Sequence, residues 1–169
     1  EQYRDIYFAP KVNFNIDDLT VDNTASDSLK KQAGSFNDLT FGYSIKNDKR
    51  NRRFMPTDGH ILSFSQELPV ITDSESIFNS LRYRTYHAFS DNVVGALKFY
   101  TAAVSSLGDK DVRLSKRLHL GRNLLRGFEP SKIGPKDGND YVGGNYATAL
   151  NLEAALPNIL PESTETDIS

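Results

Sequence analysis

The sequence predicts an all-β protein, an antiparallel up-and-down transmembrane β-barrel of which this chain supplies about six consecutive strands. Apolar residues alternate with polar or small residues along most of the chain, which is the pattern of strands with two unlike faces. The alternating segments are mostly about 9–12 residues long, and tilted strands of about 9–11 residues cross the hydrocarbon core of a bilayer. Their second face mixes Gly, Ala and Ser with charged residues, as a polar lumen allows.

Six segments carry this alternation, and we predict one strand from each. Their bounds are Ile6–Ile16, Leu39–Lys46, His60–Leu68, Phe78–Phe89, Val93–Ala103 and Tyr146–Leu156. One face of each strand is apolar and includes, in chain order, Phe8, Phe41, Phe64, Leu81, Leu97 and Leu150. The opposite face includes, in the same order, Lys11, Lys46, Glu67, Arg82, Lys98 and Glu153. We therefore expect lipid against the first face and the lumen against the second.

The connections between these strands differ in length, and strand parity assigns them to two ends. Ser90–Asn92 is a tight turn, and bacterial barrels place short turns on the periplasmic side and long loops outside. Parity places Asn47–Gly59, with its Pro and Gly turn residues, on the same side. It places Pro69–Ile77 and the polar segment Leu19–Gly34 on the extracellular side.

The longest connection is Ser105–Gly144, which parity also makes extracellular. Its segment Arg113–Leu120 can continue the strand ladder. A loop of this length is usually either functional or disordered, so it is the first place to look for a site.

Bulk properties exclude several classes of protein. The 169 residues are enough for one domain or a piece of a larger one. A net charge of -2 lacks the basic footprint of a nucleic-acid-binding protein, and the absence of Cys excludes disulfides and thiolate metal sites. The mean hydropathy of -0.50 suggests a soluble protein. However, only every second residue of a membrane strand faces lipid, so a barrel also has a low average.

The chain reads as a fragment of a longer protein. It begins in what resembles the middle of a strand, and no signal peptide is recognisable at Glu1. No run of about 18 apolar residues is present, so we expect no transmembrane helix. Because a membrane barrel needs at least about eight strands, we expect the isolated fragment to have open edges and to aggregate.

An enzymatic site has no positive support in the sequence. His60, His87 and His119 share no ligand spacing, and Asp137–Asp140 lacks the remaining ligand positions of a calcium loop, so it is interpreted as a turn. Neither a Gly-x-Ser-x-Gly elbow nor a phosphate loop occurs. We therefore predict no catalytic residue, no metal and no cofactor. The basic run Lys49–Arg53 could contact lipid headgroups, but a solvated turn is favoured.

Several blocks of the sequence resemble the BamA family of outer-membrane β-barrel assembly proteins. The longest is Leu124-Leu125-Arg126-Gly127-Phe128, with Ile133-Gly134-Pro135 after it. Gly143-Gly144-Asn145 leads into a strand that contains Leu152-Glu153. Earlier blocks are Asp38–Ser44, Arg53–Gly59 and Leu118–Gly121. An isolated Arg-Gly-Phe is common, and Glu153 alone could be a solvated strand residue, so the ordered series of blocks carries the resemblance.

The resemblance implies that the long loop folds into the lumen of a barrel of 16 strands, as the family's sixth extracellular loop does. Arg126 would then bind Glu153, since a guanidinium can form two parallel hydrogen bonds to a carboxylate. Gly127 would be the permissive backbone position and Phe128 the packed ring. The supporting residues of this loop latch are Gly121, Gly134, Pro135, Gly143, Gly144 and Asn145. The family's second acidic partner would lie beyond Ser169.

The resemblance also implies a function and partners. The protein would fold and insert other outer-membrane proteins in the outer membrane of a bacterium. Its partners would be unfolded outer-membrane proteins as clients, accessory lipoproteins and outer-membrane lipids, and client strands would pair with an exposed strand edge. Three alternatives stay open: a related two-partner-secretion translocation pore, a general porin, and a soluble β-sandwich that binds a ligand.

Overall fold

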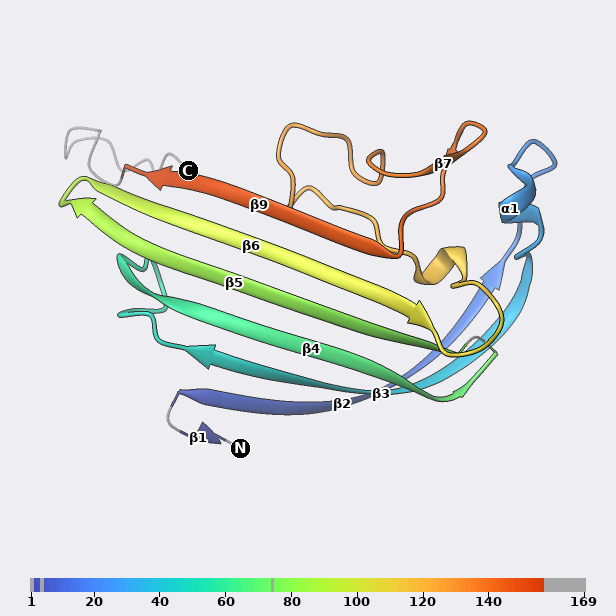
Figure 1. Ribbon diagram of the computed structural model, residues 1–169, viewed down its shortest axis with the longest axis horizontal. Helices are drawn as coiled ribbons and strands as arrows, with labels where there is room; N and C mark the ends of the chain where they lie inside the picture. Colours follow the sequence, from blue (N-terminus) through green and yellow to red (C-terminus); the bar gives the residue numbers. More distant parts are fainter. Residues whose placement is uncertain (1, 4, 74, 157–169) are drawn as a thin grey trace.

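The computed structural model describes residues 2–3, 5–73 and 75–156. Six long strands and one long loop make up most of the described chain (Figure 1). The strands are β1 (Gln2–Tyr3), β2 (Ile6–Leu19), β3 (Gly34–Asp48), β4 (Asp58–Thr72), β5 (Ser76–Ser90), β6 (Val93–Ser106), β7 (Lys136–Asp137), β8 (Asp140–Tyr141) and β9 (Tyr146–Ala155). The helical pieces are α1 (Asp27–Lys30) and the 3-10 turn η1 (Leu114–Lys116). No helix among the described residues is long and apolar enough to cross a membrane.

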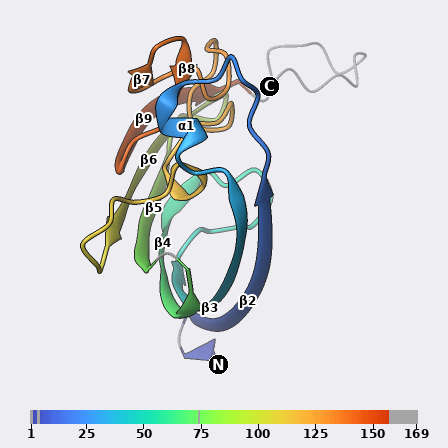
Figure 2. The same cartoon turned by 90° about the vertical axis from the view of Figure 1, so that its right-hand side faces the viewer.

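The long strands form one antiparallel sheet in the order β1-β2-β3-β4-β5-β6-β9. β7 and β8 form a separate hairpin. Within the large sheet, each strand pairs with the strand that precedes or follows it in the chain. The sheet curves, so that in Figure 2 its strands outline an open trough. This topology confirms the predicted all-β, up-and-down fold.

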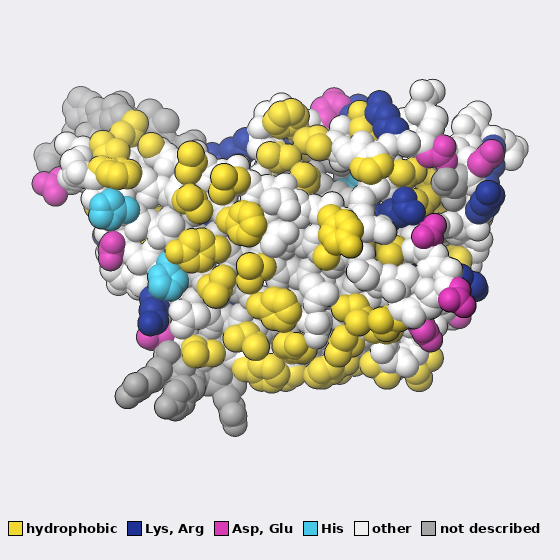
Figure 3. Space-filling view, in the orientation of Figure 1, with side chains coloured by type: hydrophobic (Ala, Val, Ile, Leu, Met, Phe, Trp, Pro, Cys, Tyr) yellow, Lys and Arg dark blue, Asp and Glu magenta, His cyan; other side chains and the backbone are white. Residues whose placement is uncertain are grey.

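The two faces of the sheet separate as the alternation predicts. Val12 pairs with Phe41, whereas the next positions pair Lys11 with Gly42. Large apolar side chains that point away from the loop-bearing face are exposed: Phe8, Val12, Phe14, Ile16, Phe41, Ile45, Leu62, Leu150 and Leu152. In Figure 3 hydrophobic side chains cover the middle of the face, while most charged ones gather toward its two ends. Such a belt, apolar at mid-height, is the surface that a membrane barrel presents to lipid.

The opposite face, here called the inner face, carries polar and small side chains in register across the sheet. Lys46 pairs with Ser63, Ser63 with Arg82, Arg82 with Tyr100, and Tyr100 with Ala149. The most buried apolar residues of β6 and β9 also lie on this face, and they include Ala102, Val104, Ala147 and Ala149. Val112, Leu114 and Val142 of the long loop are equally buried. The small core of the chain therefore lies between the inner face and this loop.

Five of the six predicted strands are longer in the structure than the alternation predicted, whereas β9 ends one residue earlier, at Ala155. β3, β4 and β5 each have 15 residues, because their polar ends stay paired after the apolar alternation stops. Two register shifts bend the sheet, one between Leu39 and Thr40 against β4 and one between Ala88 and Ser90 against β6. Bulges of this kind redirect side chains. The first lies next to Asp38, and the second includes Phe89.

One sequence prediction about the long loop is wrong. The segment Arg113–Leu120 does not continue the ladder, because it forms η1 and then only an isolated bridge from Leu118 to Gly144. The polar segment Leu19–Gly34 is not wholly irregular either, since it contains α1. The predicted turn at Asp137–Asp140 is confirmed as the tip of the β7–β8 hairpin. Strand parity is also confirmed, with the long loop and the β2–β3 connection at one end of the sheet (Figure 1).

Candidate functional site: the long loop on the inner face

The long loop connects β6 to β9 and covers residues 107–145. It leaves the sheet at Leu107, whose amide donates to the carbonyl of Glu75 in the β4–β5 turn at 2.9 Å. It returns at Asn145, whose carbonyl accepts the amide of Val104 at 2.9 Å. Between these ends the loop is attached to the sheet at several separate points, which together decide where the Arg-Gly-Phe motif lies.

The first attachment is an ion cluster around Asp38, a β3 residue only 2% exposed. The Nζ atom of Lys116 lies 2.6 Å from one carboxylate oxygen of Asp38, and the hydroxyl of Thr72 donates to the other. The guanidinium of Arg113 lies 3.9 Å from the same carboxylate and 3.3 Å from the ring centroid of Phe36. A buried carboxylate thus holds two cations of the loop against the wall formed by β3 and β4.

The connection between β2 and β3 also holds the loop. The side-chain oxygen of Gln32 accepts the amide of Leu114 at 2.6 Å, and a carboxylate oxygen of Asp140 accepts the amide of Ser26 at 2.9 Å. Figure 2 shows α1 beside the β7–β8 hairpin at the same end of the molecule. The β2–β3 connection is therefore a second structural support for the loop.

The middle of the loop is held where its two arms meet. Leu118 and Gly144 exchange both backbone hydrogen bonds, at 2.8 and 3.0 Å. Gly143 has φ 71°, and a Cβ atom there would come within 2.7 Å of Nε2 of His119. The left-handed backbone favours glycine at this position, and so does the carbonyl oxygen of Leu118, which would lie 3.0 Å from such a Cβ atom.

The Arg-Gly-Phe motif follows a tight turn. The carbonyl of Gly121 accepts the amides of Leu124 and Leu125, at 2.9 and 3.2 Å. The side-chain amide of Asn151 in β9 then donates to the carbonyl of Leu124 at 2.9 Å. Because Asn151 belongs to the inner face, this bond attaches the loop directly before Arg126 to the predicted lumen wall.

Arg126 and Phe128 are both exposed, and Phe128 is 59% accessible. Gly127 between them has φ 83°, and a Cβ atom there would meet nothing within 4 Å. The left-handed backbone therefore favours glycine here, whereas steric crowding does not. Beyond the motif, Lys132 forms an ion pair with Glu129. The hydrogen bond between these two side chains raises the pKa of Lys132.

The structure does not bring Arg126 and Glu153 together. Glu153 lies on the inner face with Asn151, as its parity predicted, but its carboxylate pairs with Lys98 of β6 at 2.5 Å. Arg126 forms no ion pair with any residue that the structure describes. The Arg126–Glu153 pair therefore stays a prediction for the longer protein, and Lys98 is the partner that sequence reasoning missed.

The remaining predicted support residues lie along the returning arm. Pro135 accepts the amide of Val142 at 3.1 Å and so closes the base of the β7–β8 hairpin. Gly134 has φ 122°, while Gly121 is exposed with open space around it. The supports thus shape the loop, but no single contact gathers them around Arg126.

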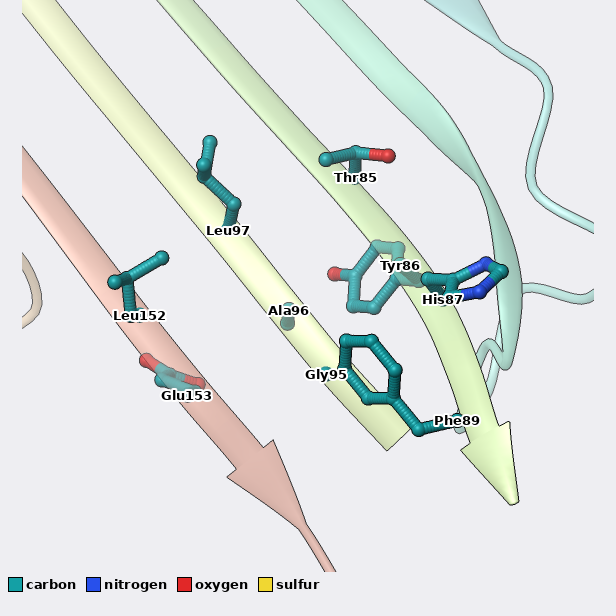
Figure 4. Close-up of a pocket in the computed structure, with 9 residues that line it drawn as sticks. All are labelled: Thr85, Tyr86, His87, Phe89, Gly95, Ala96, Leu97, Leu152 and Glu153. Carbon is teal, nitrogen blue, oxygen red and sulfur yellow. The ribbon is translucent and has the colours of Figure 1, made fainter. Parts of the chain in front are cut away.

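The turn end of the sheet has its own features. Arg50 of the basic run forms two hydrogen bonds of 2.8 Å with Asp48, and Arg53 reaches the hydroxyl of Tyr7 at 3.4 Å. On the other face a pocket of about 280 Å³ lies between β5, β6 and β9. Figure 4 shows the ring of Phe89 beside Gly95 in this pocket. Among the described residues, no three His, Asp or Glu side chains are grouped closely enough to bind a metal ion.

Comparison with known proteins decides the family. The family model of the Omp85 superfamily domain matches residues 4–167, nearly the whole chain. The chain belongs to the Omp85 superfamily. A SAM50-like protein of Schizosaccharomyces pombe is 30% identical to it over 140 residues, which cover 79% of this chain and 30% of the relative.

A solved structure supports the fold of this Omp85 chain. The crystal structure of BamA from Haemophilus ducreyi, lacking POTRA domains 1–3, matches with a TM-score of 0.69 at 22% identity. The match covers 78% of this chain and 29% of the BamA chain. The chain therefore spans about 30% of the length of these two relatives, and its open sheet corresponds to part of a larger outer-membrane β-barrel.

Sequence reasoning missed most of the anchors of the loop in this Omp85 chain. Asp38 lay one residue outside the predicted strand, and its partners Arg113 and Lys116 lay in a segment interpreted as a possible continuation of the ladder. The available signal was the parity of Asp38, which puts a carboxylate on the polar face beside apolar Leu39. Parity identifies a face, but it does not identify a partner far away in the chain.

Proposed function

We propose that this chain is the loop-bearing part of a factor that folds and inserts other β-barrel proteins into an outer membrane. The observation that carries the proposal is the attachment of the long loop to both sides of the inner face. Lys116 ties it to Asp38 of β3, and the carbonyl of Leu124 is bound by Asn151 of β9. Superfamily membership and the similarity to BamA and to a SAM50-like protein support the same function.

In this proposal the loop acts as a structural latch and performs no chemistry. Docking of Arg126 on Glu153 would fix the loop inside the lumen, and client strands would pair with a strand edge elsewhere in the barrel, where backbone groups are available. The clients would be unfolded outer-membrane proteins, with accessory lipoproteins and membrane lipids as further partners. No cofactor is required, because strand pairing and apolar burial drive insertion.

The compartment has two candidates. One relative is bacterial and the other comes from a eukaryote, so the membrane is either the outer membrane of a bacterium or that of a mitochondrion. We propose the bacterial outer membrane, on the resemblance of the Arg126 and Glu153 blocks to the BamA family. Fractionation of cells that produce the full-length protein distinguishes the two.

The test uses the full-length protein in cells depleted of their own assembly factor. Wild type and Arg122→Ala, a control at an exposed arginine in the same loop, should restore folding of a reporter barrel. Arg126→Ala should lower the yield of folded reporter several-fold while the variant itself still reaches the membrane. If wild type only exports a soluble passenger and folds no reporter barrel, the assembly function is wrong and the translocation pore is favoured.

A further inference from the structure

The Asp38 cluster has no counterpart in the predicted latch, although it is the most deeply buried ionic contact of the loop. Asp38 is 2% exposed, while the side chains of Arg113 and Lys116 are 8% and 26% exposed. The Lys98–Glu153 pair is about 30% exposed on both sides. Removing one partner of a buried ion pair is strongly destabilising, because the charge that remains has no water to solvate it.

The local backbone explains why Asp38 points at the loop. Pro69 of β4 pairs with Thr40, whereas Ile71 pairs with Leu39, so that Val70 is an extra residue opposite the ladder. A proline lacks the amide needed for a regular ladder and is common at such bulges. The register shift brings Thr72 opposite Asp38, where its hydroxyl donates to the carboxylate. Because of the bulge, one carboxylate oxygen of Asp38 accepts the hydroxyl of Thr72, and the other oxygen binds Lys116 of the loop.

The charges of the cluster are unequal. Two loop cations, Arg113 and Lys116, face one carboxylate. The three guanidinium nitrogens of Arg113 are buried and have no hydrogen-bond acceptor among the described residues. Stacking on Phe36 and attraction to Asp38 are what hold this guanidinium. Without the negative charge of Asp38, the buried Arg113 and the half-buried Lys116 would repel each other.

We propose that Asp38 is a positioning residue that fixes the base of the long loop to the β3 wall, so that the Arg-Gly-Phe motif is held over the inner face. This inference rests on the proposed function of the loop. Downstream of the cluster, the Leu118–Gly144 bridge and the single bond from Asn151 to Leu124 hold the chain up to Arg126. Release of the base removes the support on the far side from β9, so the motif loses its place even though Asn151 is unchanged.

The chain offers a matched control in Asp48. It lies on the same strand and the same face as Asp38, and it too binds an arginine, Arg50 at 2.8 Å. Its partners belong to the β3–β4 turn and to β3, at the opposite end of the sheet from the loop. Loss of charge at Asp48 therefore reports the general cost of removing an ion pair from β3, without any contact to the loop.

The experiment measures amide hydrogen exchange in the full-length protein in lipid nanodiscs, for wild type, Asp38→Asn, Asp38→Glu, Lys116→Met and Asp48→Asn. In Asp38→Asn we expect exchange in residues 112–126 to rise at least tenfold, with β5 and β6 as protected as in wild type. Lys116→Met should give a smaller rise, because Arg113 can still pair with Asp38. Asp38→Glu should restore most of the protection, and Asp48→Asn should leave the loop unchanged.

Two results would overturn the inference: unchanged loop exchange in Asp38→Asn, or an equal rise in β5 and β6, which would make Asp38 a residue of the general fold. Reporter-barrel folding is measured on the same variants. A released loop in Asp38→Asn with normal reporter folding supports the positioning role and contradicts the proposed role of the docked loop in assembly. The two proposals therefore fail separately.

Discussion

The Nζ atom of Lys98 lies 2.5 Å from a carboxylate oxygen of Glu153, on neighbouring strands of the inner face. The residue predicted to receive Arg126 therefore already binds a lysine. A carboxylate has acceptor sites on both oxygens, so Lys98 does not exclude the arginine. It does share the negative charge, and this reduces what Arg126 gains by docking.

Sharing of Glu153 predicts that Arg126 and Lys98 are energetically coupled. We expect Arg126→Ala to slow reporter-barrel folding more strongly in a Lys98→Met background than in wild type, because Glu153 then loses its last cation. Contacting residues of one ionic network typically couple by about 0.5–3 kcal/mol, and the partial exposure of Glu153 favours the lower half. A double-mutant cycle on folding rates measures the coupling, and strictly additive losses would contradict the predicted pair.

Removal of the Asn151 side chain should loosen the tip of the loop. Asn151→Ala leaves the carbonyl of Leu124 without its donor, and a hydrogen bond of this kind contributes about 1 kcal/mol net. We therefore expect amide exchange at Leu124 and Leu125 to become roughly fivefold faster. Thr148→Ala on the opposite face of β9 is the control, and equal acceleration in both variants would argue against a specific anchor.

Gly127 should be sensitive to backbone conformation but not to side-chain size. With φ 83° and open space around its Cβ position, alanine there costs about 1–2 kcal/mol for the left-handed conformation. Asparagine should cost less, because it adopts this region more readily. Gly121→Ala is the control, since it has the same open space without a left-handed φ. Reporter folding should fall in the order Gly121→Ala, Gly127→Asn, Gly127→Ala, and an effect that follows side-chain volume would refute this account.

Gly95 and Phe89 should show a steric dependence on each other. A Cβ atom on Gly95 would lie 2.4 Å from Cε2 of Phe89, so Gly95→Ala must displace the ring that Figure 4 shows beside it. Because Phe89 is 71% exposed and can move, we expect a loss near the lower end of the 1–3 kcal/mol typical of overpacking. In a Phe89→Ala background the same substitution should cost almost nothing. Urea unfolding of the full-length protein in lipid vesicles measures both.

Strand positions and faces could be predicted from the sequence, and the strand ends could not. The alternation around Phe8 and Lys11 correctly assigned both residues to their faces because neighbouring side chains on a strand point in opposite directions. β3 nevertheless extends beyond its predicted start to Gly34, because hydrogen bonding to a neighbouring strand holds residues that carry no alternation.

The sequence by itself determined the sheet and its two faces, since both depend on residues close together in the chain. Only the tertiary structure decided which charges meet. Glu153 pairs with Lys98, and Asp38 pairs with Lys116. Such choices depend on distance, burial and competition between residues far apart in the sequence, and alternation contains no information about them.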